Sequence, residues 1–179
     1  NPVADDLKEI YEHVTVPIVN VHTILNAGGR LSRVMIGKNY NDFLSACRLL
    51  DSFYRTAPDT AYQTVLASCG GFPKDINFIQ AHKAINNAAM FVKPGGSLII
   101  LAQCPDGIGS DTFLPYFSHG SFNRAFRAIR SDYRGNGGTA LCMMDKTRQI
   151  NIFIKTQLDD NICAAMEIKK IDTGMIQSL

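Results

Sequence analysis

The 179-residue sequence lacks the features that mark several classes of protein. No apolar run approaches the roughly 20 residues of a membrane-spanning helix, so a membrane protein is not expected. The 18 Lys+Arg against 16 Asp+Glu leave a formal charge of only +2, which is too balanced for a binder of nucleic acid or of a membrane surface. Arginines at helical spacing from Arg124 to Arg134 are therefore interpreted as a solvated helix face or a contact with another domain.

The five cysteines form no CxxC motif, and their wide spacing and odd number argue against a disulfide framework or a zinc cluster. Reduced thiols and a cytoplasmic location are expected. The four histidines form neither HxH nor HExxH, so no metal site is expected within the chain. Cys69 lies in no GxSxG frame and is interpreted as a small buried residue at a strand end.

Composition predicts one globular domain over residues 1–179. The sequence is 46% hydrophobic, with 14 Gly and 7 Pro, and it shows no internal repeat and no linker long enough to divide it. It opens on Asn1-Pro2-Val3, without an initiator Met, a signal sequence or a transit-peptide composition. The numbering is therefore expected to begin within a longer protein.

The first third of the sequence predicts a hairpin between two helices. Hydrophobic residues at helical spacing indicate helices over residues 4–14 and 41–54. Between them, β-branched residues over 18–25 and 31–36 flank the turn residues Asn26 to Gly29.

The remainder predicts alternating strands and helices. A short apolar run at 64–67, a helix over 76–92, a stop at 93–96 and an apolar strand at 98–102 indicate a βαβ unit with parallel strands. Helices over 122–132 and 139–148, separated by a break at Gly135-Asn136-Gly137-Gly138, and a strand over 150–155 continue the pattern. We expect a three-layer, Rossmann-like α/β domain with a mainly parallel sheet, carrying the early hairpin at one edge.

Ligands of such sheets bind beyond the carboxyl ends of the parallel strands, here in the loops after residues 67 and 102. Gly70 and Gly71 allow close approach of the backbone, and the next helix is expected to offer free N–H groups to an anion. Lys74 adds positive charge. The spacing matches neither GxGxxG nor GxxxxGK[ST], and a simple chain-turning role for the two glycines fits the local sequence equally well.

Gln80 and Lys83 are three residues apart and are expected to share one helix face, with His82 on another side. They could form a two-pronged polar clamp. A solvated helix face explains the same spacing, and the pattern alone favours it over the clamp.

Two long motifs stand out in the sequence, the first from Ser68 to Asn77 and on to residues 93–96, and the second from Ile99 to Gly109. Both resemble the C-terminal domain of the nickel-pincer lactate racemase family. The opening Asn1-Pro2-Val3 also resembles a segment that leads into this domain. The first motif continues through five residues of the predicted helix: Gln80, Lys83, Ala84, Asn87 and Ala88.

The resemblance implies a two-domain enzyme that interconverts the stereoisomers of a small 2-hydroxy acid. Its nickel pincer nucleotide accepts and returns a hydride, and an N-terminal domain preceding Asn1 would hold that cofactor and the catalytic residues. In this chain the resemblance assigns substrate binding to Gln80 and Lys83. The chain alone is expected to be inactive and to hold no cofactor or metal. The expected cleft loops contain Gly70, Gly71, Lys74, Asp75, Gly107 and Gly109.

Two positions depart from the family pattern, with Ile79 in place of Tyr and Gln103 in place of Glu. A lost phenolic hydroxyl would alter hydrogen bonding in the cleft, so a related 2-hydroxy acid fits as well as lactate. The alternative hypothesis is a non-catalytic, Rossmann-like domain that binds a ligand or another protein.

Overall fold

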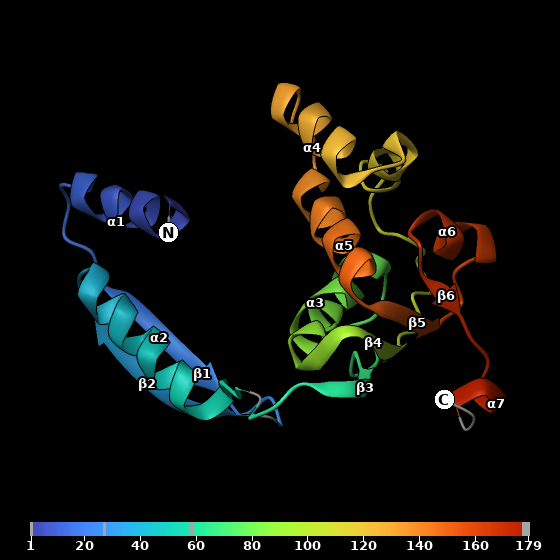
Figure 1. The fold of residues 1–179 in the computed structure, drawn as a ribbon. Coiled ribbons are helices and arrows are strands. Elements are labelled where there is room, and N and C mark those ends of the chain that lie inside the picture. The colour runs from blue at the N-terminus through green and yellow to red at the C-terminus, as the bar shows by residue number, and fades with distance from the viewer. Residues whose placement is uncertain (1, 27, 58, 177–179) are drawn as a thin grey trace. The chain divides into compact units, whose positions relative to one another are not determined.

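A computed structural model describes residues 2–26, 28–57 and 59–176. The chain divides into two compact units, Asn1–Ala57 and Pro58–Leu179, and each is described by itself (Figure 1). The expectation of a single domain over 1–179 stays a prediction. Among the described residues, no helix combines the length and the apolar character needed to cross a membrane.

The first unit is a β-hairpin between two helices. It contains α1 (Pro2–His13), β1 (Asn20–Leu25), β2 (Leu31–Gly37) and α2 (Tyr40–Tyr54). The strands are antiparallel, and the turn is stabilised by Oδ1 of Asn26, which accepts hydrogen bonds from the N–H groups of Gly28 and Arg30. The predicted helices and hairpin are confirmed.

The hairpin forms its own two-stranded sheet, and the described strands of the second unit form a separate four-stranded one. The expectation that the hairpin lies at an edge of the main sheet is therefore wrong. On one hairpin face, Ile24 is buried and the ring of His22 lies 5.9 Å from that of Phe43 on α2. This face of the hairpin thus packs against α2, and the hairpin strands do not pair with the parallel sheet.

The second unit is built on a parallel sheet of order β3-β4-β5-β6. The expected α/β class with a mainly parallel sheet is confirmed. The longer elements are β3 (Tyr62–Ser68), α3 (Phe78–Ala88), β4 (Val92–Leu101), α4 (Phe122–Ser131), α5 (Gly137–Gln149) and β5 (Asn151–Lys155). The shorter ones are η1 (Ala89–Phe91), η2 (Leu114–His119), α6 (Asp160–Ala165), β6 (Lys169–Lys170) and α7 (Thr173–Ile176).

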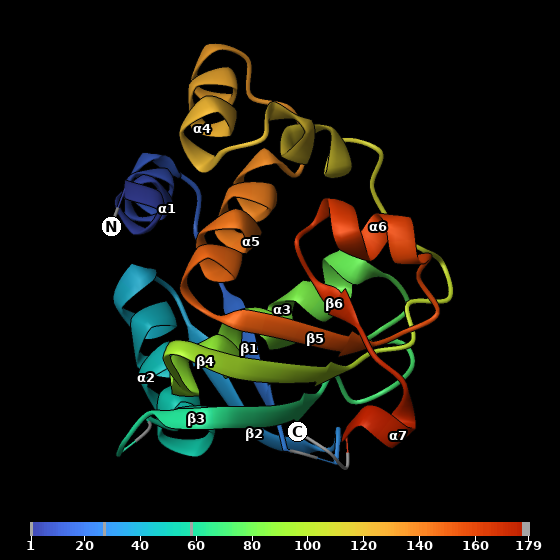
Figure 2. The same cartoon turned by 45° about the vertical axis from the view of Figure 1, so that its right-hand side comes forward.

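Helices α3 and α5 lie on the same face of this sheet (Figure 2). The sequential strand order explains this, because successive right-handed crossovers place their helices on one side. The core lies in this layer: Leu98, Ile100 and Ile154 are fully buried, and Phe78 of α3 packs against Phe113 with 5.6 Å between ring centroids. The carboxyl ends of β3, β4 and β5 meet at one edge, where the predicted loops emerge.

Two glycine-rich stretches expected to interrupt the chain belong to regular elements instead. Residues 93–96 lie within β4, where the pairing shifts between Val92, opposite Tyr62, and Ser97, opposite Thr64. Gly96 is needed there because a Cβ would come 2.7 Å from the carbonyl oxygen of Gln63. Gly137 and Gly138 begin α5, whereas the sequence predicted a break. The elements η2, α6, β6 and α7 were not predicted.

Candidate functional site

A cavity of about 280 Å³ lies beside the first turns of α3. Three of the predicted site residues, Lys74, Gln80 and Lys83, line it together. The helix contributes side chains at intervals of three and four residues, the spacing of one helix face. The complete lining is Cys69, Lys74, Gln80, Lys83, Ala84 and Asn87.

Gln80 and Lys83 form a bonded pair within this cavity. Nζ of Lys83 donates a 2.7 Å hydrogen bond to Oε1 of Gln80. The ammonium keeps two further hydrogens and the amide keeps its two N–H donors. The pair can therefore offer several donors at once to oxygen atoms of a carboxylate or hydroxyl group.

The start of α3 does not offer free N–H groups to an anion, and that expectation is wrong. The N–H of Phe78 donates to the carbonyl of Gly107 at 3.0 Å, and that of Ile79 donates to the carbonyl of Ile108 at 3.1 Å. Oδ1 of Asn77 accepts the N–H of Gln80 at 3.0 Å. The loop after β4 and the N-cap residue thus satisfy the donors that a phosphate or carboxylate would need.

Gly70 and Gly71 both have left-handed backbones, with φ of 85° and 72°. Residues with side chains rarely adopt this conformation, so the two glycines allow the chain to turn here. The turn is closed by the N–H of Lys74, which donates to the carbonyl of Gly71 at 2.8 Å.

Gly71 and Asp75 line a second cavity, of about 420 Å³, at the carboxyl ends of β3, β4 and β5. Asp75 is only 4% exposed, and its Oδ2 accepts the N–H of Gln103 at 2.9 Å. Its carboxylate thus joins the two predicted loops. The other lining residues were not predicted as site residues, although their position after parallel strands was a usable signal. They are Ser68, Phe72, Leu101, Ala102, Gln103, Lys155 and Thr173.

Of the remaining predicted loop residues, Gly107 and Gly109 support α3 and line neither cavity. Ile79 also lies outside both linings and packs against the hydrophobic core. In this chain, residue 79 thus contributes to the core and to neither cavity.

Two ionisable groups near α3 are held neutral by their surroundings. Burial, together with the charges of Cys104 and Asp75, raises the pKa of the Cys69 thiol to about 11, so Cys69 is not a thiolate nucleophile at neutral pH. Burial, and then the charge of Lys146, lowers the pKa of His82 to about 4. His82 is absent from the cavity lining, as its position on the helix predicted.

Within the part of the chain that the structure describes, no three His, Cys, Asp or Glu side chains gather in a way that could hold a metal ion. The implied nickel cofactor needs ligands that this donor set does not provide. These residues therefore do not fit a nickel site. Arg124, Arg127 and Arg130 of α4 are all exposed, which fits either a solvated helix face or a contact with another domain.

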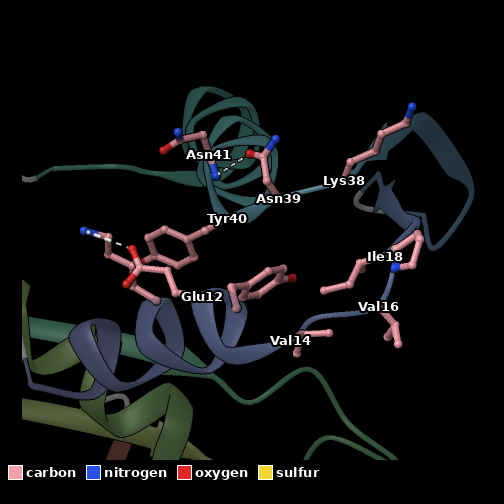
Figure 3. A pocket seen from close by; sticks show the side chains of 11 residues that line it. Glu12, Val14, Val16, Ile18, Lys38, Asn39, Tyr40 and Asn41 are labelled. Atoms are coloured by element: carbon pink, nitrogen blue, oxygen red, sulfur yellow. Dashed lines mark hydrogen bonds and ion pairs between the residues drawn. The ribbon is translucent and has the colours of Figure 1, made fainter.

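The first unit holds a further cavity, of about 430 Å³, between α1, the segment after it and the start of α2 (Figure 3). Val14, Val16 and Ile18 supply apolar walls. Its charged residues include Lys8 and Glu12, whose side chains form an exposed ion pair at 3.6 Å. None of the predicted site residues line this cavity.

Comparisons with known proteins find similarity over much of the chain. Residues 58–134 match the family model of the lactate racemase C-terminal domain. A curated relative, the lactate racemase of Thermoanaerobacterium thermosaccharolyticum, is 24% identical over 117 residues, which are 65% of this chain and 27% of that protein. The chain thus spans about a quarter of its relative's length.

Solved structures show the same fold. The lactate racemase apoprotein from T. thermosaccharolyticum superposes with a TM-score of 0.74 at 21% identity, covering 88% of this chain and 39% of that one. A crystal structure of a Thermotoga maritima protein superposes with a TM-score of 0.63 at 12% identity, covering 95% of this chain and 46% of that one. At these coverages, both matches include residues of both units.

Proposed function

We propose that this chain holds the substrate in a 2-hydroxy acid racemase or epimerase, because residues 58–134 match the family model of the lactate racemase C-terminal domain. The observation that carries the proposal is the pair formed by Gln80 and Lys83 in the cavity beside α3. The two residues come from the motif that resembles the family, and they share one cavity.

The chemistry of this pair suits a small 2-hydroxy acid. The Lys83 ammonium neutralises the substrate carboxylate, and the Gln80 amide donates to a carboxylate or hydroxyl oxygen. Holding these oxygens fixes the position of the α-carbon, where a hydrogen must leave and return for stereochemistry to change. Because the α3 backbone amides are already bonded, the two side chains provide this hold.

The rest of the active site is proposed to lie in another domain of the same protein. The chain spans 27% of its curated relative, so a complete enzyme of that size would include further domains. We propose that an N-terminal domain holds the nickel pincer nucleotide and the catalytic residues, and that this cofactor supplies hydride acceptance when bound. The wide spacing of the five cysteines supports a cytoplasmic location.

The test is an assay of the complete parent protein, expressed with the machinery that makes and loads its cofactor. We expect isomerisation of lactate or a related 2-hydroxy acid, reduced at least about 100-fold by the double change Gln80→Ala and Lys83→Ala. Lys93→Ala is the matched control, because Lys93 is an exposed lysine in β4 that lines neither cavity.

Absence of isomerisation by the cofactor-loaded wild type, or full activity of the double variant, would contradict the proposal. An upstream domain without the cofactor-binding residues would instead favour the non-catalytic binding domain. For the 179-residue chain alone we predict no turnover and no stoichiometric nickel in metal analysis.

A further inference from the structure

The loop after β4 is joined to the segment that leads into α3 by a series of backbone hydrogen bonds. The N–H of Cys104 donates to the carbonyl of Asp75 and that of Asp106 to the carbonyl of Ile76, both at 2.9 Å. Further along, the N–H groups of Phe78 and Ile79 donate back to Gly107 and Ile108. Each segment therefore donates hydrogen bonds to the other, and these bonds fix the alignment of the two segments.

Gly109 ends this contact against the N-cap of the helix. A Cβ on Gly109 would overlap with the amide carbon, nitrogen and oxygen of Asn77. That same amide oxygen accepts the N–H of Gln80. The absence of a side chain at Gly109 thus allows Asn77 to reach the backbone of a clamp residue.

The loop is itself anchored in the sheet. The carbonyl of Gln103 accepts the N–H of Gln157 at 2.9 Å and the hydroxyl of Thr156 at 3.1 Å, both just after β5. The N–H of Gln103 donates to the carboxylate of Asp75. The start of α3 is therefore connected to the carboxyl ends of β4 and β5 through hydrogen bonds that leave it little freedom to shift.

We propose that Asn77 and Gly109 are positioning residues for the Gln80–Lys83 pair. Neither residue lines the cavity. Both act through the first turn of α3, because the position of that turn sets the positions of Gln80 and, three residues later, of Lys83. The role as positioning residues in catalysis rests on the function proposed above. A displacement of about 1 Å in groups that hold a reacting substrate is enough to slow a reaction strongly.

The decisive variants are Gly109→Ala and its matched control Gly95→Ala. Both glycines have left-handed backbones, with φ of 81° and 75°, so alanine introduces comparable backbone strain at each. A Cβ on Gly95 meets nothing within 4 Å, whereas one on Gly109 meets Asn77. A change in exchange or activity that occurs in Gly109→Ala but not in Gly95→Ala is therefore caused by the contact with Asn77, the N-cap of α3.

The first measurement is amide hydrogen exchange on the 179-residue chain, which needs no cofactor. We expect exchange at Phe78, Ile79 and Gln80 to accelerate at least about 10-fold in Gly109→Ala and in Asn77→Ala, but not in Gly95→Ala. Asn77→Asp should restore protection of Gln80, because a carboxylate accepts the same hydrogen bond. Unchanged exchange in Asn77→Ala would overturn the proposed contact.

The second measurement is steady-state kinetics of the complete parent protein. We expect Gly109→Ala and Asn77→Ala to lower kcat about 10- to 100-fold with a smaller change in KM, and Asn77→Asp to recover most of it. Equal kcat in Gly109→Ala and Gly95→Ala, or no rescue by Asn77→Asp, would reject the positioning role. If Gly109→Ala does not fold, the two Asn77 variants decide.

The proposed function and the positioning role of Asn77 and Gly109 can be contradicted by different measurements. A cofactor-loaded wild type that isomerises no 2-hydroxy acid removes the proposed function and, with it, the catalytic role of the two residues. The exchange measurement still decides whether Asn77 and Gly109 hold the start of α3.

Discussion

The ammonium of Lys83 lies 2.7 Å from the amide oxygen of Gln80, one helical turn away on the same face of α3. Neither end of this pair is needed by the core, because Lys83 is exposed and Gln80 is half-buried. Cys69 and Lys74 also line the cavity that this pair borders. A polar pair held at the surface beside a cavity is available to a ligand, and its loss should be separable from loss of the fold.

The first prediction is that Lys83→Met leaves stability almost unchanged. An exposed hydrogen-bonded pair contributes at most about 1 kcal/mol to the free energy of unfolding. Denaturant unfolding of the wild type and Lys83→Met measures the difference. A loss well above that value would mean that Lys83 supports the fold, and an activity defect of the variant could then not be assigned to substrate binding.

The second prediction concerns Phe78 at the start of the same helix. Phe78 is fully buried and packs against Phe113, so Phe78→Ala should cost about 3–5 kcal/mol through lost burial and the cavity left behind. The same denaturant titration tests it. A cost below about 1 kcal/mol would show that α3 is not packed on the core as described.

The third prediction is a loss of stability in acid caused by His82. Its pKa is lowered from 6.5 to about 4 by burial and then by the charge of Lys146. Between these pH values the unfolded chain binds a proton that the folded chain does not, so the free energy of unfolding falls as pH drops from about 6.5 to about 4.

His82→Leu should remove that part of the pH dependence, because leucine does not titrate. His119→Gln is the control, since His119 is exposed. Unfolding titrations at pH 7, 5.5 and 4.5 compare the three proteins. If the free energy of unfolding falls equally steeply with pH in the wild type and in His82→Leu, His82 is not held neutral in the folded protein.

The fourth prediction is an order of cysteine reactivity. Burial raises the pKa of Cys69 and Cys104 to about 11, and it also raises that of Cys163. Because only the thiolate attacks, alkylation of the native protein at pH 8 should label the exposed Cys142 first. Mass spectrometry after brief iodoacetamide treatment gives the order, and denatured protein, in which all five should react, is the control. Early labelling of Cys69 would contradict it.

Much of the fold follows from periodicity that the sequence displays directly. The helix containing Gln80 and Lys83 was predictable because apolar and polar residues alternate at helical spacing, and the same spacing places the two side chains on one face. The strands before and after it were predictable as apolar runs bounded by glycine. These are local properties of the chain, so no tertiary information was needed.

Other parts could not be predicted because they depend on partners distant in sequence. Residues 93–96 have the composition of a turn, yet the pairing of Val92 with Tyr62 and of Ser97 with Thr64 keeps them within β4. The glycines that begin α5 read as a break, but Gly137 lies against the ring of Tyr116, where a side chain would collide. In both cases packing overrides local preference.

By itself, the sequence determined the α/β class, the hairpin and the position of Gln80 and Lys83 on one helix face, through periodicity. Only the tertiary structure decided what surrounds this pair. From the sequence alone, the first backbone N–H groups of α3 were expected to be free to bind an anion. In the fold, two of them donate hydrogen bonds to the carbonyls of Gly107 and Ile108. The reason is physical: a helix must satisfy its first N–H groups, and which acceptors do so depends on the loops that folding brings to its end.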